Sequence, residues 1–145
     1  MKEGEENELL SPVSMVSALG MTANGAQGET REQMEEVMGA SAEALNLCLQ
    51  SCREASGQEE EGVLHLANSI WFLDDGKFQL KEDFLRTNAA YYGASLYGAP
   101  FDDTTRKDIN RWVKRETDGM IEEIVREIPP LAVMYLVNAL SFEAL

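Results

Sequence analysis

The sequence predicts a single α+β domain in which helices pack on a sheet. With 145 residues, 44% of them hydrophobic, the chain is long enough for one domain with a core and too short for two ordinary ones. Several segments repeat apolar residues at intervals of three and four, as amphipathic helices do. Residues 63–73 alternate in polarity and residues 132–142 are nearly all apolar, and both patterns indicate strands.

The predicted elements follow one another with short connections. In chain order they are an extended segment at 9–12, helices at 13–24, 30–38 and 41–55, a strand at 63–73, a helix at 81–92, a short strand at 94–97, a helical region at 105–125 and a strand at 132–142. Residues 56–62 contain no apolar side chain, so we expect a solvated loop there.

Local signals set the ends of the helices. Asn24-Gly25 and Gly93 follow helical segments in the manner of C-terminal caps, and Gly39 ends the second helix. A capping box from Thr30 to Gln33, in which each side chain can satisfy a free amide of the other residue, begins the second helix. We therefore expect separate short helices joined by turns.

The helical region at 105–125 is the longest. The polar run at 102–105 opens it, Trp112 lies on its core face, and Gly119 interrupts it. An apolar face then continues towards the proline pair at 129–130, so the predicted region extends beyond the glycine.

The chain carries a strong negative charge. Its formal net charge is −14, and so acidic a surface repels phosphate backbones and anionic headgroups, which disfavours nucleic-acid binding. No run of about 18 apolar residues exists, and the N-terminus is acidic where a secretion signal would be basic. We expect neither a membrane span nor an export signal in this chain.

The two cysteines, Cys48 and Cys52, are too few for a disulfide framework. Their spacing differs from the C-x-x-C of redox and zinc sites. On a helix they would lie one turn apart on one face, which suits a mutual disulfide poorly. We expect buried or half-buried free thiols, and the cysteines leave the redox compartment open.

Ordinary catalytic and cofactor signatures are absent from the sequence. The single histidine, His65, lies in the middle of a predicted strand without a neighbouring cysteine or carboxylate, which favours a structural or surface role. No G-x-S-x-G elbow and no phosphate-binding loop is present. The acidic pairs at 74–75 and 102–103 lie at a turn and a helix start, where carboxylates commonly bind backbone amides. We expect no enzyme, no cofactor and no metal site.

Asn138 is the most informative polar residue, because it interrupts a strand whose neighbouring residues favour burial. A buried amide without a partner costs about 1–3 kcal/mol, so it should form hydrogen bonds. Ser11 and Ser14, near an apolar helix start, are candidate partners. The residues alone leave a second interpretation equally open, in which Ser11 caps its helix through Ser14 and Asn138 contacts only backbone.

Four blocks of the sequence, in this order, resemble the serpin family. They are NELLSPVS (7–14) with ALGM (18–21) and GAQGET (25–30), LANSIW (66–71), INRWV (109–113) with TDGMI (117–121), and LVNALSF (136–142). Together they span nearly the whole chain, and the resemblance is to the N-terminal half of a serpin, a serine protease inhibitor.

The resemblance implies helices B to F packed on part of a large mixed or antiparallel sheet A, with strands 1, 2 and 3. It assigns helix B to 13–24, helices C and D to the next two helices, strand 2 to 63–73, helix E to 81–93, strand 1 to 94–97, the helix F region to 105–125 and strand 3 to 132–142. It also places Ser11, Ser14 and Asn138 in the shutter, the polar cluster beneath the point where sheet A opens, which favours a shared network.

The chain departs from the family pattern at both ends. The family's helix A should precede Asn7, and strand 5, sheet C, the reactive loop and the last strands of sheet B should follow Leu145. We therefore expect a partial serpin domain over residues 1–145 without the reactive bond and without the strand 5 histidine that usually completes the shutter. Glu8 also stands where an apolar strand residue is commoner.

For the complete protein, the resemblance implies a suicide-substrate inhibitor of serine or cysteine proteases. Such a protein offers a loop as bait and, once cleaved, inserts it between strands 3 and 5 while the protease is still acyl-linked. This chain alone would not inhibit. A non-inhibitory serpin with a binding, storage or chaperone role, and a small acidic interaction domain, are the alternatives. The resemblance favours an extracellular location, with a cytoplasmic one, as in ovalbumin-like serpins, as the alternative.

The strand at 132–142 predicts a further property on physical grounds. A long apolar strand with no later strand beside it has an open edge, and another chain can pair with that edge. We expect the chain by itself to fold poorly, to oligomerise, or to bind the missing C-terminal portion or another strand in trans. A monodisperse monomer with a cooperative melt would contradict this expectation.

Overall fold

The computed structural model of the protein describes residues 11–56 and 62–144. Its elements in chain order are α1 (Pro12–Ala23), α2 (Gly28–Met38), α3 (Ala42–Ser56), β1 (Gly62–Leu73), α4 (Glu82–Tyr92), β2 (Ser95–Ala99), α5 (Asp103–Glu116) and β3 (Met134–Ala144). Residues 9 and 10 of the predicted extended segment, and residues 57–61 of the predicted loop, lie outside the described part. In that described part, no helix combines the length and apolar character that crossing a membrane requires.

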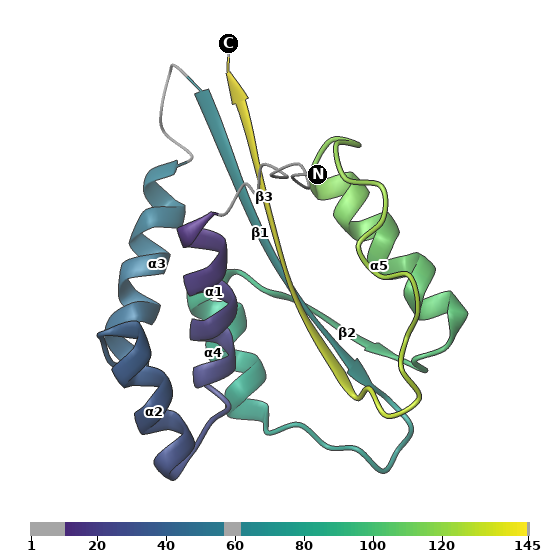
Figure 1. Cartoon of the computed structure of the whole chain (residues 1–145), viewed down its shortest axis with the longest axis horizontal. Coiled ribbons are helices and arrows are strands. Elements are labelled where there is room, and N and C mark those ends of the chain that lie inside the picture. The colour runs from purple at the N-terminus through teal and green to yellow at the C-terminus, as the bar shows by residue number, and fades with distance from the viewer. Residues whose placement is uncertain (1–10, 57–61, 145) are drawn as a thin grey trace, which may run out of the picture.

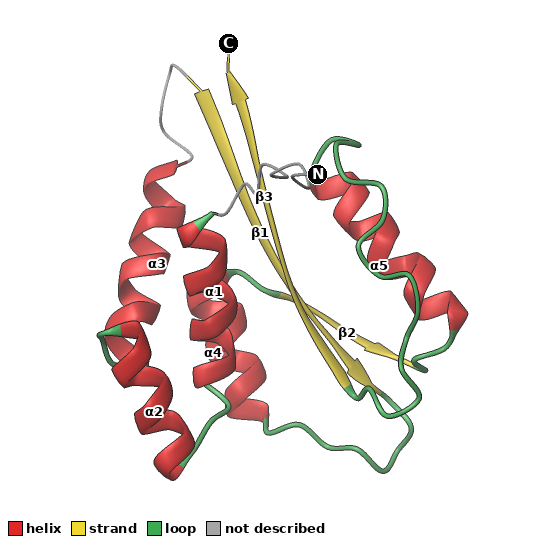
Figure 2. Cartoon of the chain, in the orientation of Figure 1, coloured by secondary structure: helices red, strands yellow, loops and turns green. Residues whose placement is uncertain are grey.

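A three-stranded sheet in the order β2-β1-β3 forms the centre of the fold (Figure 2). β1 pairs antiparallel with β3, from Gly62 opposite Ala144 to Phe72 opposite Met134. It pairs parallel with β2 over residues 69–73. A parallel pair requires a crossover connection, and α4 lies in that connection. β1 is therefore the central strand, with β2 and β3 at the two edges.

Helices cover both faces of the sheet, which confirms the predicted α+β class. Figure 1 shows α1 to α4 on one side of the strands and α5 on the other. On the first side, Met21 of α1 and Tyr92 of α4 pack in one core with Ile70. On the second side, Trp112 of α5 packs in another core with Trp71. Ile70 and Trp71 are consecutive residues of β1, so the alternation of the strand places one in each core.

The helices cover the middle of β3 more closely than its C-terminal end. Val137 and Ala139 are buried on the side of α5, and Leu136 packs on the side of α1 to α4. Phe142, near the end of the strand, is 62% exposed. The nearly all-apolar sequence of residues 132–142 predicts a strand buried on both faces. The structure confirms this burial for the α5 side of the strand, only in part for the side of α1 to α4, and not for the C-terminal end.

Three asparagines connect the end of α1 to α3 and α4. Asn24 Nδ2 donates to Oδ1 of Asn46 at 3.0 Å and to Oδ1 of Asn88 at 2.9 Å. Asn46 Nδ2 returns a hydrogen bond to Asn24 Oδ1, and Asn88 Nδ2 donates to the carbonyl of Met21. Asn46 and Asn88 are buried, so these bonds are shielded from water and position both helices on α1.

α3 turns a different face inward from the one that the sequence predicts. Asn46 and Leu49 are buried, whereas Cys48 and Cys52 are both exposed. The prediction of buried or half-buried thiols is therefore wrong. The helix is only weakly apolar, and its rotation is set by the hydrogen bonds of Asn46 to Asn24 and by the packing of Leu49 in the core.

The predicted capping box of Thr30 and Gln33 is also wrong. α2 begins at Gly28, after Gln27, whose side chain makes no capping hydrogen bond. Thr30 consequently lies inside the helix, and Gln33 Nε2 donates to Oε1 of Glu29 at 3.2 Å. An acidic side chain in the first turn favours this earlier start through the helix dipole.

Glycine ends two helices, as predicted. Gly39 after α2 and Gly93 after α4 have φ of 72° and 60°, in the left-handed region that glycine adopts without strain. Asn24 is the C-cap of α1 and keeps right-handed geometry.

α5 ends at Glu116, whereas the predicted helical region extends to residue 125. Asp118 and Gly119 have φ of 48° and 81°, so the chain leaves the helix there. The following segment runs back alongside α5 without helical structure (Figure 1). Its apolar residues are divided, with Val125 buried and Ile124 exposed.

Asn110 of α5 holds this returning segment in place. Its Nδ2 donates to the carbonyl of Val125 at 2.8 Å, and its Oδ1 accepts from the backbone N–H groups of Ile124 at 2.9 Å and Val125 at 3.0 Å. Asn110 is buried. One side chain therefore satisfies three backbone groups of a segment that has no ladder of its own.

Asp102 provides a test of the start of α5, because its side chain accepts from the N–H groups of Thr104 at 2.9 Å and Thr105 at 3.2 Å. We expect Asp102→Ala to lower the free energy of unfolding by about 1 kcal/mol, the usual effect of losing an N-cap. Asp102→Asn keeps the accepting oxygen and should change it by less than about 0.5 kcal/mol. Urea unfolding followed by circular dichroism measures both. If the two variants lost the same free energy of unfolding, the negative charge of Asp102, and not its capping hydrogen bonds, would be what stabilises the helix.

Candidate functional site

Ser11 and Ser14 lie at the start of α1. Ser11 has an extended backbone, with φ of −100° and ψ of 111°, and its Oγ accepts from the N–H of Ser14 at 3.3 Å. Pro12, the first residue of the helix, has no N–H that needs a partner. The structure thus contains the helix cap that one of the two interpretations of these serines predicts.

Asn138 lies in β3 directly opposite Asn68 of β1. Its Nδ2 donates to Asn68 Oδ1 at 2.7 Å, and Asn68 Nδ2 donates in turn to the backbone carbonyl of Tyr92 at 3.0 Å. Asn68 is buried. The two asparagines therefore form a chain of hydrogen bonds from β3 through β1 to the last residue of α4.

No hydrogen bond joins Asn138 to Ser11 or Ser14 within the described residues. α1 does pack against β3, and Asn138 Oδ1 is buried without a partner in the part of the chain that the structure describes. The structure thus brings the three predicted residues into neighbouring elements without linking them. Their assignment to a shutter stays a prediction.

Sequence reasoning missed Asn68, although the sequence contains a signal for it. The apolar face of β1 is formed by alternate residues, and Asn68 interrupts it between Leu66 and Ile70. Asn138 interrupts the apolar pattern of β3 in the same way. Two such interruptions in strands that pair with each other are a sign that the polar residues meet.

Other unpartnered polar atoms lie on the same side of the sheet. Within the described residues, the hydroxyls of Ser17 in α1 and Tyr92 in α4 are buried and have no hydrogen-bond partner, like Oδ1 of Asn138. A buried polar group in this state costs about 1–3 kcal/mol. The packing of α1 and α4 on the sheet is therefore less favourable here than elsewhere in the core.

The hydroxyl of Tyr92 lies directly against α1. A Cβ atom added to Gly20 would be 2.1 Å from that oxygen, so α1 and α4 can approach this closely only with glycine at this position. Burial raises the pKa of Tyr92 to about 12, so the side chain is neutral at ordinary pH.

The outer edge of β3 is open. β3 pairs with β1 along its whole length, and none of the other described residues pairs with its second edge. Glu143 is the only charged residue of the strand, and the strand contains no proline. Charges and prolines are the usual features that protect an edge, so β3 offers backbone groups to an added strand.

One aspartate of each acidic pair binds backbone amides, as predicted, whereas Asp103 of the second pair forms ion pairs with Arg106 and Lys107. Asp75 Oδ1 accepts from the N–H groups of Lys77 and Phe78, both at 2.8 Å, and Asp102 caps α5. The N–H of Phe78 and then that of Lys77 lower the pKa of Asp75 from its usual value. His65 is exposed. In residues 11–56 and 62–144, no three His, Cys, Asp or Glu side chains come together as a metal site.

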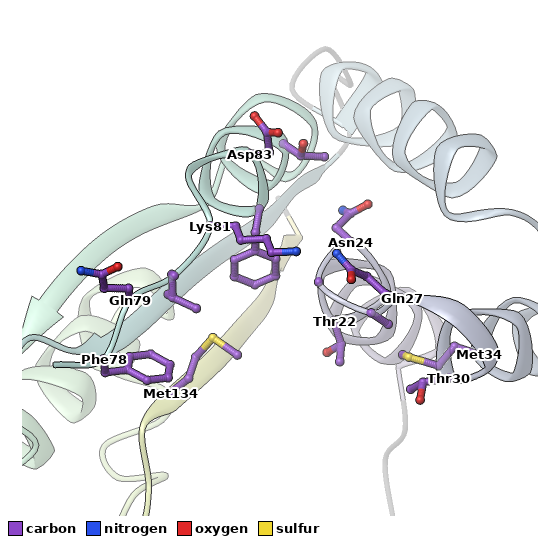
Figure 3. Close-up of a pocket in the computed structure, with 15 residues that line it drawn as sticks. Thr22, Asn24, Gln27, Thr30, Met34, Phe78, Gln79, Lys81, Asp83 and Met134 are labelled. Atoms are coloured by element: carbon purple, nitrogen blue, oxygen red, sulfur yellow. The ribbon is translucent and has the colours of Figure 1, made fainter.

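A groove of about 600 Å³ lies at the opposite end of α1 from Ser11. Figure 3 shows Phe78 and Met134 on one side of it and Met34 on the other, with Lys81 above. The groove is mostly apolar, and it is separate from the asparagine pair. It therefore forms no part of the candidate shutter site.

The asparagine pair predicts a coupling energy. Asn68→Ala and Asn138→Ala should each lower the free energy of unfolding by about 1–3 kcal/mol, because each leaves a buried amide without its partner. The double variant should lose less than the sum, with a coupling of at least about 0.5 kcal/mol. Urea unfolding of the four proteins measures this cycle.

Ser14→Ala combined with Asn138→Ala is the control cycle. No hydrogen bond joins the two side chains within the described residues, so their losses should add to within about 0.5 kcal/mol. Strong coupling between Ser14 and Asn138 would contradict this arrangement and would indicate the shared network that the resemblance favours.

Tyr92→Phe should raise the free energy of unfolding by about 1 kcal/mol, because it removes a buried hydroxyl without a partner. The wild-type tyrosine ionises more readily when unfolded, so its stability should fall as the pH rises from 10.0 towards about 12, and Tyr92→Phe should lack this component. Urea unfolding across that pH range measures both effects, with Tyr91→Phe as the control. A loss of stability in Tyr92→Phe would mean that the hydroxyl has a partner.

Comparison with known proteins identifies one family that matches the chain over its whole length. A sequence model of the serpin family, described as serine protease inhibitors, matches residues 1–145. Alpha-2-antiplasmin of Bos taurus is 35% identical, over 94% of this chain and 27% of that protein. Neuroserpin of Mus musculus is 31% identical, over 96% of this chain and 35% of that protein. The chain thus spans only about a quarter to a third of these relatives' length.

Solved structures agree with this match. The thermophilic serpin tengpin in its latent state is 46% identical, with a TM-score of 0.91 over 99% of this chain and 39% of that one. Tengpin in its native state is 45% identical, with a TM-score of 0.87 over 99% of this chain and 38% of that one. The family match over the whole sequence and the shared arrangement of helices and strands show that this protein belongs to the serpin family.

Proposed function

We propose that this chain is the N-terminal part of a serpin which, when complete, inhibits a serine-type endopeptidase by inserting its cleaved reactive loop into the sheet beside β3. Membership of a family described as serine protease inhibitors supports this proposal. The chain covers 27% of alpha-2-antiplasmin and 39% of latent tengpin. Inhibition is therefore proposed for the complete protein, and the chain alone is not competent to inhibit.

The observation that carries the proposal is the open edge of β3. The strand is 11 residues long, has one charged residue, and has a free second edge within the described part of the chain. An inserted loop gains main-chain hydrogen bonds along the whole strand that it joins. β3 is long enough and sufficiently unprotected to receive such a loop, or another strand in trans.

The outward face of α1 supports a larger complete protein. α1 contains no charged residue, and its Val13, Met15 and Leu19 are 39%, 51% and 39% exposed. A helix that is apolar on all sides is typical of the interior of a larger protein. We propose that the remaining part of the serpin covers this face, so that α1 becomes a central helix.

The same proposal includes Ser11, Ser14 and Asn138 as shutter residues. Its support is that Oδ1 of Asn138, a residue of the edge strand β3, is a buried acceptor without a partner among the described residues. The strand 5 histidine that the family resemblance implies would be a suitable donor. The serines would then act through the start of α1, which packs on the same strand.

A chimera tests the inhibitory function. Residues 1–145 are joined to the remaining part of tengpin, whose matching region is 46% identical, so that the tengpin part supplies the reactive loop. We expect the chimera to form a detergent-resistant complex with a serine protease that native tengpin also traps. This chain alone, and a protease with a blocked active-site serine, should form no such complex.

The outcomes separate the candidate functions. A folded chimera, shown by a cooperative melt, that is cleaved without forming a complex would contradict the inhibitory function and favour a non-inhibitory serpin. If the chimera does not fold, binding of the separate chain to the tengpin part still tests whether this chain supplies half of a serpin fold, and failure to bind would contradict that.

An extracellular site of action belongs to the same proposal and rests on the family resemblance alone. The alternative is a cytoplasmic location.

A further inference from the structure

Cys48 and Cys52 form an exposed pair of thiols on α3. Both are free and exposed, and a spacing of four residues places them one turn apart on the same face of the helix. α3 packs through Asn46 and Leu49 on a different side, so the fold makes no use of the thiols.

The helix geometry does not suit a disulfide between these residues. Cβ atoms one turn apart are separated by about 5–6 Å, whereas a disulfide requires about 3.5–4.5 Å. Closing the bond would distort α3. A metal ion between the two sulfurs removes this problem, because two metal–sulfur bonds of about 2.3 Å each allow the sulfurs to remain more than 4 Å apart.

The number of available ligands restricts the kind of metal. Within residues 11–56 and 62–144, no third His, Cys, Asp or Glu side chain joins the pair. Structural zinc takes four ligands, and calcium and magnesium take oxygen ligands. Thiolates select soft ions such as copper(I). Copper(I) has a filled d shell and is stable in linear coordination by two sulfur ligands.

We propose that Cys48 and Cys52 together bind one soft monovalent ion of the copper(I) class through both thiolates. Two S–H bonds break, two metal–sulfur bonds form, and two protons are released to solvent, with no change in oxidation state. Since the protons compete with the metal, affinity should rise with pH. The bound ion would link two turns of α3. This site is separate from the asparagine pair and does not depend on the proposed inhibitory function.

The experiment is a competition titration of the full chain, reduced with a phosphine and kept free of oxygen. Copper(I) is supplied as its complex with bicinchoninate, whose colour falls as the protein removes the metal, and native mass spectrometry counts the ions bound. We expect one ion per chain, held by the two thiolates of that chain, with the loss of two protons. Copper bound only by cross-linked dimers would overturn the proposal.

Single substitutions show whether both sulfurs are ligands. Loss of a supporting group around a metal already costs about 10–100-fold in affinity, so Cys48→Ser and Cys52→Ser should each cost more than about 100-fold. Ser51→Ala, an exposed change in the same turn, should leave the affinity unchanged. Wild-type affinity in either cysteine variant would overturn the proposal.

A relocated thiol shows whether the helix provides the geometry. Cys52→Ser combined with Glu54→Cys keeps two exposed positions but separates them by about 9 Å along the axis and turns them away from each other. If α3 is helical, this double variant should bind copper(I) as weakly as Cys52→Ser alone. Retained wild-type affinity would mean that an unfolded segment, and not the helix, holds the metal, and would overturn the proposal.

Discussion

The antiparallel pairing of β1 with β3 is the constraint on which the rest of the structure depends. It joins residues 62–72 to residues 134–144, and its register decides which side chains face each layer of helices. Ile70 packs with α1 and α4, and Trp71 packs with α5. A slip of one residue would turn every side chain of one strand to the opposite face. Both cores would then be lost together, because each contains residues from both strands.

The pairing of Asn68 with Asn138 makes this register specific. The two amides lie opposite each other on the side of α1 to α4, where an amide against an apolar residue would lose its hydrogen bond. Asn68 is further held by the carbonyl of Tyr92. The polar pair therefore connects the sheet to α4. It leaves Oδ1 of Asn138, in the edge strand β3, as a buried acceptor without a partner among the described residues.

Cover on the faces and exposure at the edge are separate properties of the sheet. α5 and the segment held by Asn110 bury one face, and α1, α3 and α4 bury the other. Neither layer pairs with the backbone groups at the outer edge of β3 in the described part of the chain. Burial of the apolar faces can thus stabilise the fold around β1 and β3 while the N–H and C=O groups at the outer edge of β3 remain available for hydrogen bonds. Insertion of a strand beside β3, as proposed for the complete serpin, would use that capacity.

The sequence by itself determined the identity of most helices and strands, the glycine caps after α2 and α4, and the importance of Asn138, because these follow from periodicity and from residues near one another in the chain. Only the tertiary structure decided where α5 ends, which face of α3 is buried and which residue pairs with Asn138. Each of these depends on a contact between elements: Asn110 with the segment that returns along α5, Asn46 with Asn24, and Asn68 with Asn138. Local patterns can mark a polar residue that needs a partner, as they do for Asn68 and Asn138, but they do not identify the partner, because the energy of a buried hydrogen bond appears only when the fold brings both groups together.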